Sequence, residues 1–192
     1  TILAQLLYGP TLVDQYSQQE SRFTDNTVDW FVDKDGTVLA REDYNNTTDT
    51  YRVYTYVNGK RELIYELETS QLPPGVTGIK ADRSALLFSD GSDADDSGNV
   101  YELDFSGHLT PASLGGKGGT IERIIKDGNR FVLGVEYSGA VPSYKFYDPD
   151  VDAAVSGMVN QFSTASVNLV SWTDDWSKLL YLIYGSDTPG SY

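Results

Sequence analysis

The chain has 192 residues, 40% of them hydrophobic and 12% aromatic, which is enough apolar material to form a buried core. Its 28 Asp and Glu outnumber its 14 Lys and Arg, giving a net charge of −14, and so acidic a surface repels the phosphate backbone of nucleic acids. No cysteine is present for disulfides or thiolate metal sites, and no run of about 18 apolar residues is present to span a bilayer. We therefore expect a soluble globular protein, cytoplasmic or periplasmic, without nucleic-acid or membrane partners.

Residues 1–27 are expected to finish a preceding structural unit or to act as a linker. They contain one strand-like stretch, ILAQLLY, followed by the polar segment DQYSQQESRFTDN. They also lack the basic start and the small-residue cleavage site of a secretory signal. The segment therefore indicates no particular compartment.

From about residue 28 onward, one pattern recurs four times. Aligned on Asp35, Asp82, Asp127 and Asp175, the chain has an apolar residue three positions before each aspartate and another four positions after it. The aspartates lie 47, 45 and 48 residues apart, a period close to that of a four-stranded propeller blade. The pattern predicts an all-β fold, a partial β-propeller of about three to four four-stranded antiparallel blades. The predicted units are residues 28–70, 76–114, 120–163 and an incomplete 167–192.

The residues around each aspartate favour hairpins. The turns DKDG and KDGN combine Gly, which accepts the positive φ of a tight turn, with Asp, which can hydrogen-bond to nearby backbone. The flanking runs, such as TYRVYTYV and RFVLGVEY, are rich in the β-branched and aromatic residues typical of strands. Residues 148–162 (DPDVDAAVSGMVNQF) indicate at most one helical turn, because Gly157 weakens a helix.

An acid-rich stretch, SDGSDADDSGNVYELD, spans residues 89–104 and connects the second and third strands of the second predicted unit. Its spacing resembles half of a calcium-binding loop, but the last ligand position, Asp104, falls on a predicted strand and no helix flanks the loop. A helix-flanked calcium site is therefore excluded, and a solvated hairpin is the default interpretation. A looser metal site stays open, with the candidate ligands Asp90, Asp93, Asp95 and Asp96.

Three stretches and their order resemble a known family: residues 27–43 (TVDWFVDKDGTVLARED), 144–150 (YKFYDPD) and 170–192 (VSWTDDWSKLLYLIYGSDTPGSY). They are similar to the β-propeller domain of bacterial prolyl oligopeptidase-type serine peptidases, in the acylaminoacyl- and dipeptidyl-peptidase-like branch. The resemblance implies a seven- or eight-bladed propeller that covers an α/β-hydrolase domain carrying a Ser-Asp-His triad. In that family, short peptides enter between the two domains.

The chain departs from this family in its catalytic motifs. It has no Gly-x-Ser-x-Gly elbow, and its single histidine, His108, lies in the predicted turn SGHLTP without a nucleophile motif nearby. We therefore assign no catalytic residue and no cofactor to this chain. The resemblance implies a noncatalytic region that gates and positions small peptide substrates for an α/β-hydrolase domain. In relatives, glutamates hold the amino terminus of the peptide, and Glu20 and Glu42 are the candidates here.

The fourth predicted unit stops after its second strand, so we expect part of a longer propeller. Its open ends would leave apolar sheet faces in water unless copies associate or further blades complete the ring.

A different class of function is a noncatalytic β-propeller that binds proteins or other ligands. It is favoured by the aromatic content and by three tryptophans suited to interfaces. We expect Trp30 and Trp172 in the core and Trp176, which replaces a turn glycine, partly exposed. A glycosidase-like propeller with paired carboxylates is a third possibility, but the acidic residues form no distinctive constellation.

Overall fold

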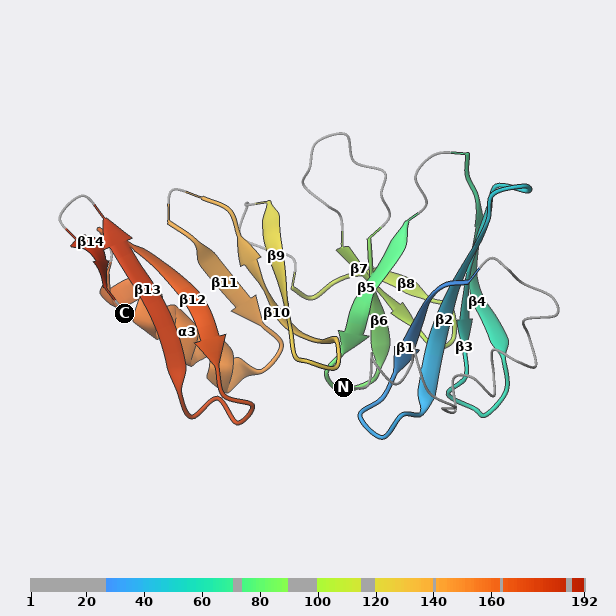
Figure 1. The fold of residues 1–192 in the computed structure, drawn as a ribbon, viewed down its shortest axis with the longest axis horizontal. Helices are drawn as coiled ribbons and strands as arrows, with labels where there is room; N and C mark the ends of the chain where they lie inside the picture. Colours follow the sequence, from blue (N-terminus) through green and yellow to red (C-terminus); the bar gives the residue numbers. More distant parts are fainter. Residues whose placement is uncertain are drawn as a thin grey trace, which may run out of the picture.

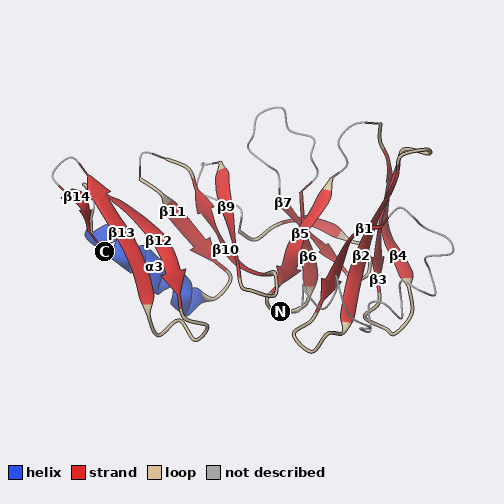
Figure 2. Ribbon diagram, in the orientation of Figure 1, coloured by secondary structure: helices blue, strands red, loops and turns tan. Residues whose placement is uncertain are grey.

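The computed structural model describes residues 27–70, 74–89, 100–114, 120–139, 141–162, 164–185 and 188–191. Within these ranges the protein is mostly β, with antiparallel hairpins and one α-helix (Figure 2). The predicted all-β class with antiparallel sheets is confirmed, whereas the arrangement of these sheets as propeller blades stays a prediction. No sheet closes on itself among the described strands.

The first sheet has four antiparallel strands in sequence order, from β1 to β4. Its strands are β1 (Thr27–Val32), β2 (Val38–Asn45), β3 (Thr50–Thr55) and β4 (Glu62–Glu68). Each strand pairs with the next through a short turn, which is the simplest way to join antiparallel strands.

The second sheet joins two sets of hairpin strands into one hydrogen-bonded array of seven. Its strands are β5 (Gly75–Lys80), β6 (Ala85–Ser89), β7 (Val100–Asp104), β8 (Leu109–Pro111), β9 (Ile121–Lys126), β10 (Phe131–Tyr137) and β11 (Ser143–Phe146). The two sets meet where β5 and β10 run parallel, with Ile79 opposite Phe131. The Ile79 N–H donates to the Arg130 carbonyl at 3.2 Å.

The last part of the chain contains a helix and a three-stranded antiparallel sheet in the order β12-β13-β14. These elements are α3 (Pro149–Gln161), β12 (Ser166–Trp172), β13 (Leu179–Gly185) and β14 (Thr188–Ser191). In Figure 1 the strands form a row, from β1–β4 at one end to β12–β14 at the other, and α3 lies beside β12 and β13.

Three layers of buried side chains separate successive groups of strands. The layer between β1–β3 and β5–β7 contains Phe31, Tyr51, Val53, Ile79, Leu86 and Phe88. The layer between β6 and β10 contains Leu87, Leu114, Val132, Val135 and Tyr137. The layer between β9–β11, α3 and β12–β13 contains Ile125, Tyr144, Phe146, Val155, Val167 and Leu169. Because side chains alternate along a strand, β6 sends Phe88 to the first layer and Leu87 to the second.

The hairpin turns at the four repeated positions share one hydrogen-bond pattern, which the turns at Gly59 and Gly107 also have. In each turn, a residue at positive φ donates its N–H to the carbonyl three residues earlier. The positive-φ residues are Gly36 (φ 90°), Arg83 (61°), Arg130 (69°) and Trp176 (57°). All four turns lie along the same edge of the row, the lower edge in Figure 1.

The turns also correct the alignment of the third unit. Asp35, Asp82 and Asp175 are each the third residue of their turn, two positions after the residue whose carbonyl accepts the N–H that closes the turn. Asp127 is instead the first residue of its turn, since its carbonyl accepts from Arg130 N–H. Asn129 is therefore the counterpart of the other three aspartates, and the sequence alignment was wrong by two residues there.

The single helical turn predicted within residues 148–162 is also wrong, because α3 runs for 13 residues. Asp148 is its N-cap, and the Asp148 side chain accepts from the N–H groups of Asp150 and Val151. Pro149 occupies the first helical position, where a missing N–H costs nothing. Val151 and Val155 are buried against the third core layer, so tertiary packing offsets the low propensity of Gly157.

Candidate functional site

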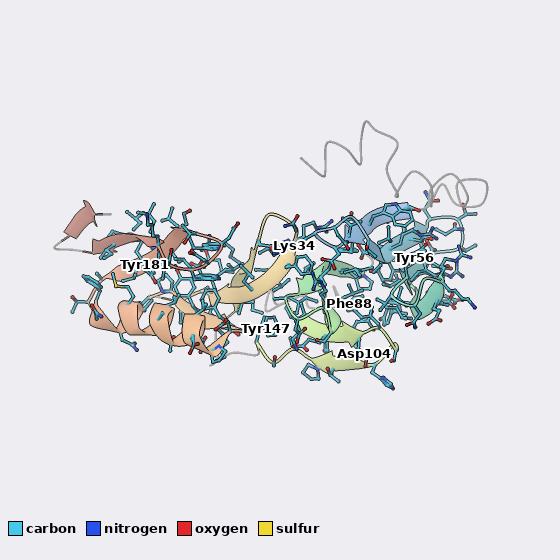
Figure 3. The ribbon with its side chains drawn as sticks, turned by 90° about the horizontal axis from the view of Figure 1, so that it is seen from below. Lys34, Tyr56, Phe88, Asp104, Tyr147 and Tyr181 are labelled. Carbon is cyan, nitrogen blue, oxygen red and sulfur yellow. The ribbon has the colours of Figure 1, made fainter. Side chains whose placement is uncertain are left out.

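Charged side chains gather where the β1–β2, β5–β6 and β9–β10 turns meet. This set, hereafter the turn cluster, consists of Asp29, Asp33, Lys34, Arg83, Asp127 and Arg130. Lys34 lies where the β1–β2 hairpin approaches β10 (Figure 3). The turn cluster forms because equivalent hairpin turns fall at one edge of the row.

Each ion pair of the turn cluster joins two different hairpins. Arg83 makes a two-point contact with Asp33, in which Nε is 2.7 Å from Oδ2 and Nη2 is 2.8 Å from Oδ1. The other two pairs are Lys34 Nζ with Asp127 Oδ2 at 3.3 Å and Arg130 Nη1 with Asp29 Oδ2 at 2.8 Å. The first hairpin is thus tied to the second and the third.

The cations of the turn cluster also lie over two buried phenyl rings. Lys34 Nζ is 5.6 Å and Arg83 Cζ 5.7 Å from the centre of the Phe131 ring. Arg130 Cζ is 4.5 Å from the centre of the Phe31 ring. The negative face of each aromatic ring attracts the cation above it, and this attraction holds the charged groups against the core.

The turn cluster presents both signs of charge to a ligand. The side chains of Lys34 and Arg83 are 60% and 53% exposed, and that of Asp29 is 37% exposed. Exposed ion pairs contribute only about 0 to 1 kcal/mol, so the charged groups of a ligand can replace them at small cost. The arrangement can therefore bind an ammonium group through Asp29 and a carboxylate through Lys34 or Arg83.

Glu42, one of the predicted peptide-binding residues, lies inside the protein and is 4% exposed. Its Oε1 accepts hydrogen bonds from the Tyr51 hydroxyl and from the Val76 N–H, the latter at 2.6 Å. Burial raises the pKa of Glu42, an effect that the two hydrogen bonds oppose. In this position Glu42 links β2 of the first sheet to β5 of the second, and its role as a peptide anchor stays a prediction.

A second carboxylate, Glu102 on β7, lies at the next junction between strands. Its Oε2 is 3.0 Å from Lys80 Nζ, and its Oε1 accepts from the Ser113 N–H and hydroxyl and from the Tyr147 hydroxyl. Burial raises the pKa of Glu102, but the bonds from Lys80 and Ser113 outweigh it and the pKa lies below its ordinary value. Burial and the neighbouring Glu102 raise the pKa of Tyr147. These contacts tie β5 and β7 to the end of β11, where Tyr147 lies (Figure 3).

Several predicted site residues lie outside the described residues. They are Glu20 and the four candidate metal ligands Asp90, Asp93, Asp95 and Asp96. Within the described ranges, no group of three or more His, Asp or Glu side chains is arranged to hold a metal ion.

His108 lies at the surface, as predicted, with its side chain 77% exposed. Its Nδ1 is 3.2 Å from Asp104 Oδ2 in the turn between β7 and β8. Asp104 also accepts the backbone N–H groups of Ser106 and His108, so it caps this turn in the way that Asp127 caps its own.

The three tryptophans are all half-buried. Trp30 and Trp172 are thus less buried than predicted, while Trp176 is partly exposed as expected. The rings of Trp172 and Trp176 are parallel, with their centres 5.3 Å apart. The centre of the Trp30 ring lies 5.8 Å from that of the Tyr56 ring.

The turn cluster was not recognised from the sequence, because its partners are far apart in the chain. The available signal was a cation beside three of the four turns: Lys34, Arg83 and Arg130. Only the stacking of the hairpins shows which aspartate each of these cations meets.

Comparisons with known protein families, with curated proteins and with solved structures each return no match. Among the helices of the described residues, none has the length and apolar character needed to cross a membrane.

Proposed function

We propose that the chain is a noncatalytic, propeller-type array of β-sheets that positions small peptides for a serine peptidase of the prolyl oligopeptidase type. The turn cluster is the observation that carries this proposal, because it offers carboxylates and cations to the two charged ends of a short peptide. The propeller interpretation is supported by hairpins that repeat every 46 or 47 residues, at 35, 82, 129 and 175, and pack through successive core layers.

Peptide binding at the turn cluster would exchange ion pairs. The peptide's ammonium group would take the place of Arg130 on Asp29, and its carboxylate would contact Lys34 or Arg83. The net charge of −14 favours the approach of the ammonium end, while the exposed cations of the turn cluster offset the repulsion of the carboxylate end. This arrangement selects short peptides, because both ends must reach the same three turns.

The test is a titration of the purified chain with the dipeptide Gly-Pro, followed by NMR, beside the same dipeptide acetylated at its amino end or amidated at its carboxyl end. We expect binding of the free dipeptide at about millimolar concentration. Blocking either end, or the substitution Asp29→Asn, which removes the carboxylate that the ammonium group would contact, should weaken binding at least about tenfold. The control Lys60→Gln, in the exposed turn after β3, should leave binding unchanged. Equal binding of the blocked and free dipeptides would overturn the proposal.

The noncatalytic part of the proposal is tested separately. The purified chain is incubated with chromogenic acylaminoacyl and dipeptidyl substrates, and we expect no release of the chromophore. Turnover by the purified chain that is lost when residues of the chain are substituted would show that the chain carries catalytic residues of its own.

A second candidate function is the binding of another protein. The observation that favours it is a group of exposed apolar side chains on the last sheet, among them Val170, Leu180 and Tyr184.

A further inference from the structure

The turn between β3 and β4 carries the Asn–Gly dipeptide Asn58–Gly59, which is the only Asn–Gly in the chain. Gly59 lies at φ 70° and donates its N–H to the Tyr56 carbonyl at 2.8 Å, so this turn has the hydrogen-bond pattern of the other hairpins. Asn58 is therefore the third residue of its turn, the position that Asp35 holds in the β1–β2 turn. The dipeptides Asn58–Gly59 and Asp35–Gly36 thus occupy equivalent places in two hairpins.

An Asn–Gly dipeptide can rearrange in water without an enzyme. The backbone nitrogen of the glycine, after losing its proton to hydroxide, attacks Cγ of the asparagine, and ammonia leaves as a succinimide ring closes. Water then opens the ring at either carbonyl group and gives aspartate or isoaspartate. Glycine favours the attack, because no side chain shields its nitrogen. The overall reaction consumes one water molecule and releases one ammonia.

The surroundings of Asn58 and Gly59 leave the reacting atoms accessible. Both residues are exposed, and a Cβ placed on Gly59 would meet no atom within 4 Å. Among the described residues, the Asn58 side chain forms no hydrogen bond, so its amide is free to turn towards Gly59. The Gly59 N–H must first leave the Tyr56 carbonyl. Because an exposed turn opens at a small cost in free energy, this bond slows the attack without preventing it.

The aspartates that precede glycines in the equivalent turns are held in place. Asp35 Oδ1 accepts the Thr37 N–H at 2.9 Å, and this bond lowers the pKa of Asp35. The carboxylate therefore stays ionised, and an ionised carboxylate is a poor electrophile. Asp127, which precedes Gly128, is held in a similar way, since its Oδ1 accepts two backbone N–H groups. Asn58 makes no such bond, so it is the residue of this group that is free to react.

We propose that Asn58 is a site of spontaneous deamidation, at which water converts the side-chain amide into aspartate and isoaspartate through a succinimide with Gly59. Each converted chain carries one negative charge more than the −14 of the intact chain, in a turn that also holds Lys60 and Arg61. Isoaspartate moreover adds a methylene group to the main chain before Gly59, so the bond to Tyr56 no longer fits the turn. The fraction of altered chains therefore grows with the age of the protein.

The experiment follows the full chain in mildly alkaline buffer over several days. Peptide mass spectrometry locates the exchange of an amide for a carboxyl group, fragmentation distinguishes aspartate from isoaspartate, and anion exchange separates the chains with the extra charge. We expect both products at Asn58, formed at least about ten times faster than any product at Asn46. Asn46 is the internal control, since it is exposed in the β2–β3 turn but precedes Thr47.

A substitution of the glycine tests the succinimide route. Gly59→Arg shields the nitrogen but suits the turn, because Arg83 and Arg130 occupy the same position at φ 61° and 69°. It should slow the conversion of Asn58 at least about tenfold, and Asn58→Ser should abolish the change of charge. Circular dichroism checks that each variant is folded.

Unfolding provides the reference rate. In guanidinium chloride the wild-type chain should react faster, because the Gly59 N–H is no longer bonded to Tyr56. A folded chain that keeps Asn58 intact while the unfolded chain reacts would overturn the proposal. Equal rates in Gly59→Arg and wild type, or aspartate as the only product, would also overturn it.

Discussion

At the scale of single residues, two buried tyrosines differ in whether their hydroxyl groups are satisfied. Tyr144 donates to the Val167 carbonyl at 3.3 Å and accepts from the Leu169 N–H at 2.9 Å, whereas the hydroxyl of Tyr181 has no hydrogen-bond partner among the described residues. Because an unsatisfied buried hydroxyl costs free energy, Tyr181→Phe should leave the free energy of unfolding unchanged or raise it by about 1 kcal/mol. Tyr144→Phe should lower it by about 1 to 2 kcal/mol. Urea unfolding of both variants measures the difference, and a larger loss for Tyr181→Phe would contradict the assignment.

Glu42 and Glu102, the two carboxylates at junctions between groups of strands (the junction carboxylates), predict opposite dependences of stability on pH. Burial raises the pKa of Glu42, so its stabilising contribution is complete below the ordinary value of 4.5 and is lost as the pH rises through the folded-state pKa. The pKa of Glu102 is lowered, so its contribution is complete above 4.5 and is lost as the pH falls. Relative to wild type, Glu42→Gln should therefore gain stability as the pH rises, and Glu102→Gln should lose it. Urea unfolding from about pH 2.5 to pH 8 tests the signs, and differences that change in the same direction would refute them.

At the scale of the elements, α3 depends on its N-cap. Asp148→Ala removes the acceptor of two backbone N–H groups and should lower the free energy of unfolding by about 1 kcal/mol. Asp148→Asn keeps a capping oxygen and should cost much less. The control Asp150→Asn alters an exposed acidic residue in the first turn and should cost at most about 0.5 kcal/mol. Equal losses in Asp148→Ala and Asp148→Asn would show that the cap is not what stabilises the helix.

The elements that were predictable from the sequence are those determined by near neighbours. A hairpin turn such as DKDG is stabilised by bonds within five residues, so its composition alone indicates it. The length of α3 was underestimated because it depends on Val155, which is buried by β11 and β12, and no local signal shows this. The burial of Glu42, a candidate peptide-binding residue, was likewise not predictable, since its bond to Val76 forms only when a second sheet lies against the first.

At the scale of the whole molecule, the ion pairs of the turn cluster and the junction carboxylates both connect neighbouring groups of strands. The pairs of the turn cluster are partly exposed, so they hold the hairpins together weakly and can be replaced by a ligand. Glu42 is 4% exposed, so removing one of its partners leaves a buried polar group unsatisfied. The Glu102 side chain is 14% exposed and is held by Lys80, Ser113 and Tyr147 at once. We infer that the core layers and these two carboxylates fix the arrangement of the sheets, whereas the turn cluster is free to take part in binding.

The arrangement of the sheets depends on how closely β5 approaches β10. A Cβ at Gly78 would lie 2.7 Å from the Arg130 carbonyl oxygen and 2.7 Å from Val132 Cγ2, so Gly78→Ala must push the two strands apart. Overpacking of this kind costs about 1 to 3 kcal/mol, and here it also strains the bond between Ile79 and Arg130. We expect a loss of that size in urea unfolding. The control Gly128→Ala, where a Cβ meets no atom within 4 Å, should be nearly neutral. If both variants were equally stable, the parallel contact between β5 and β10 would not be what joins the two halves of the row.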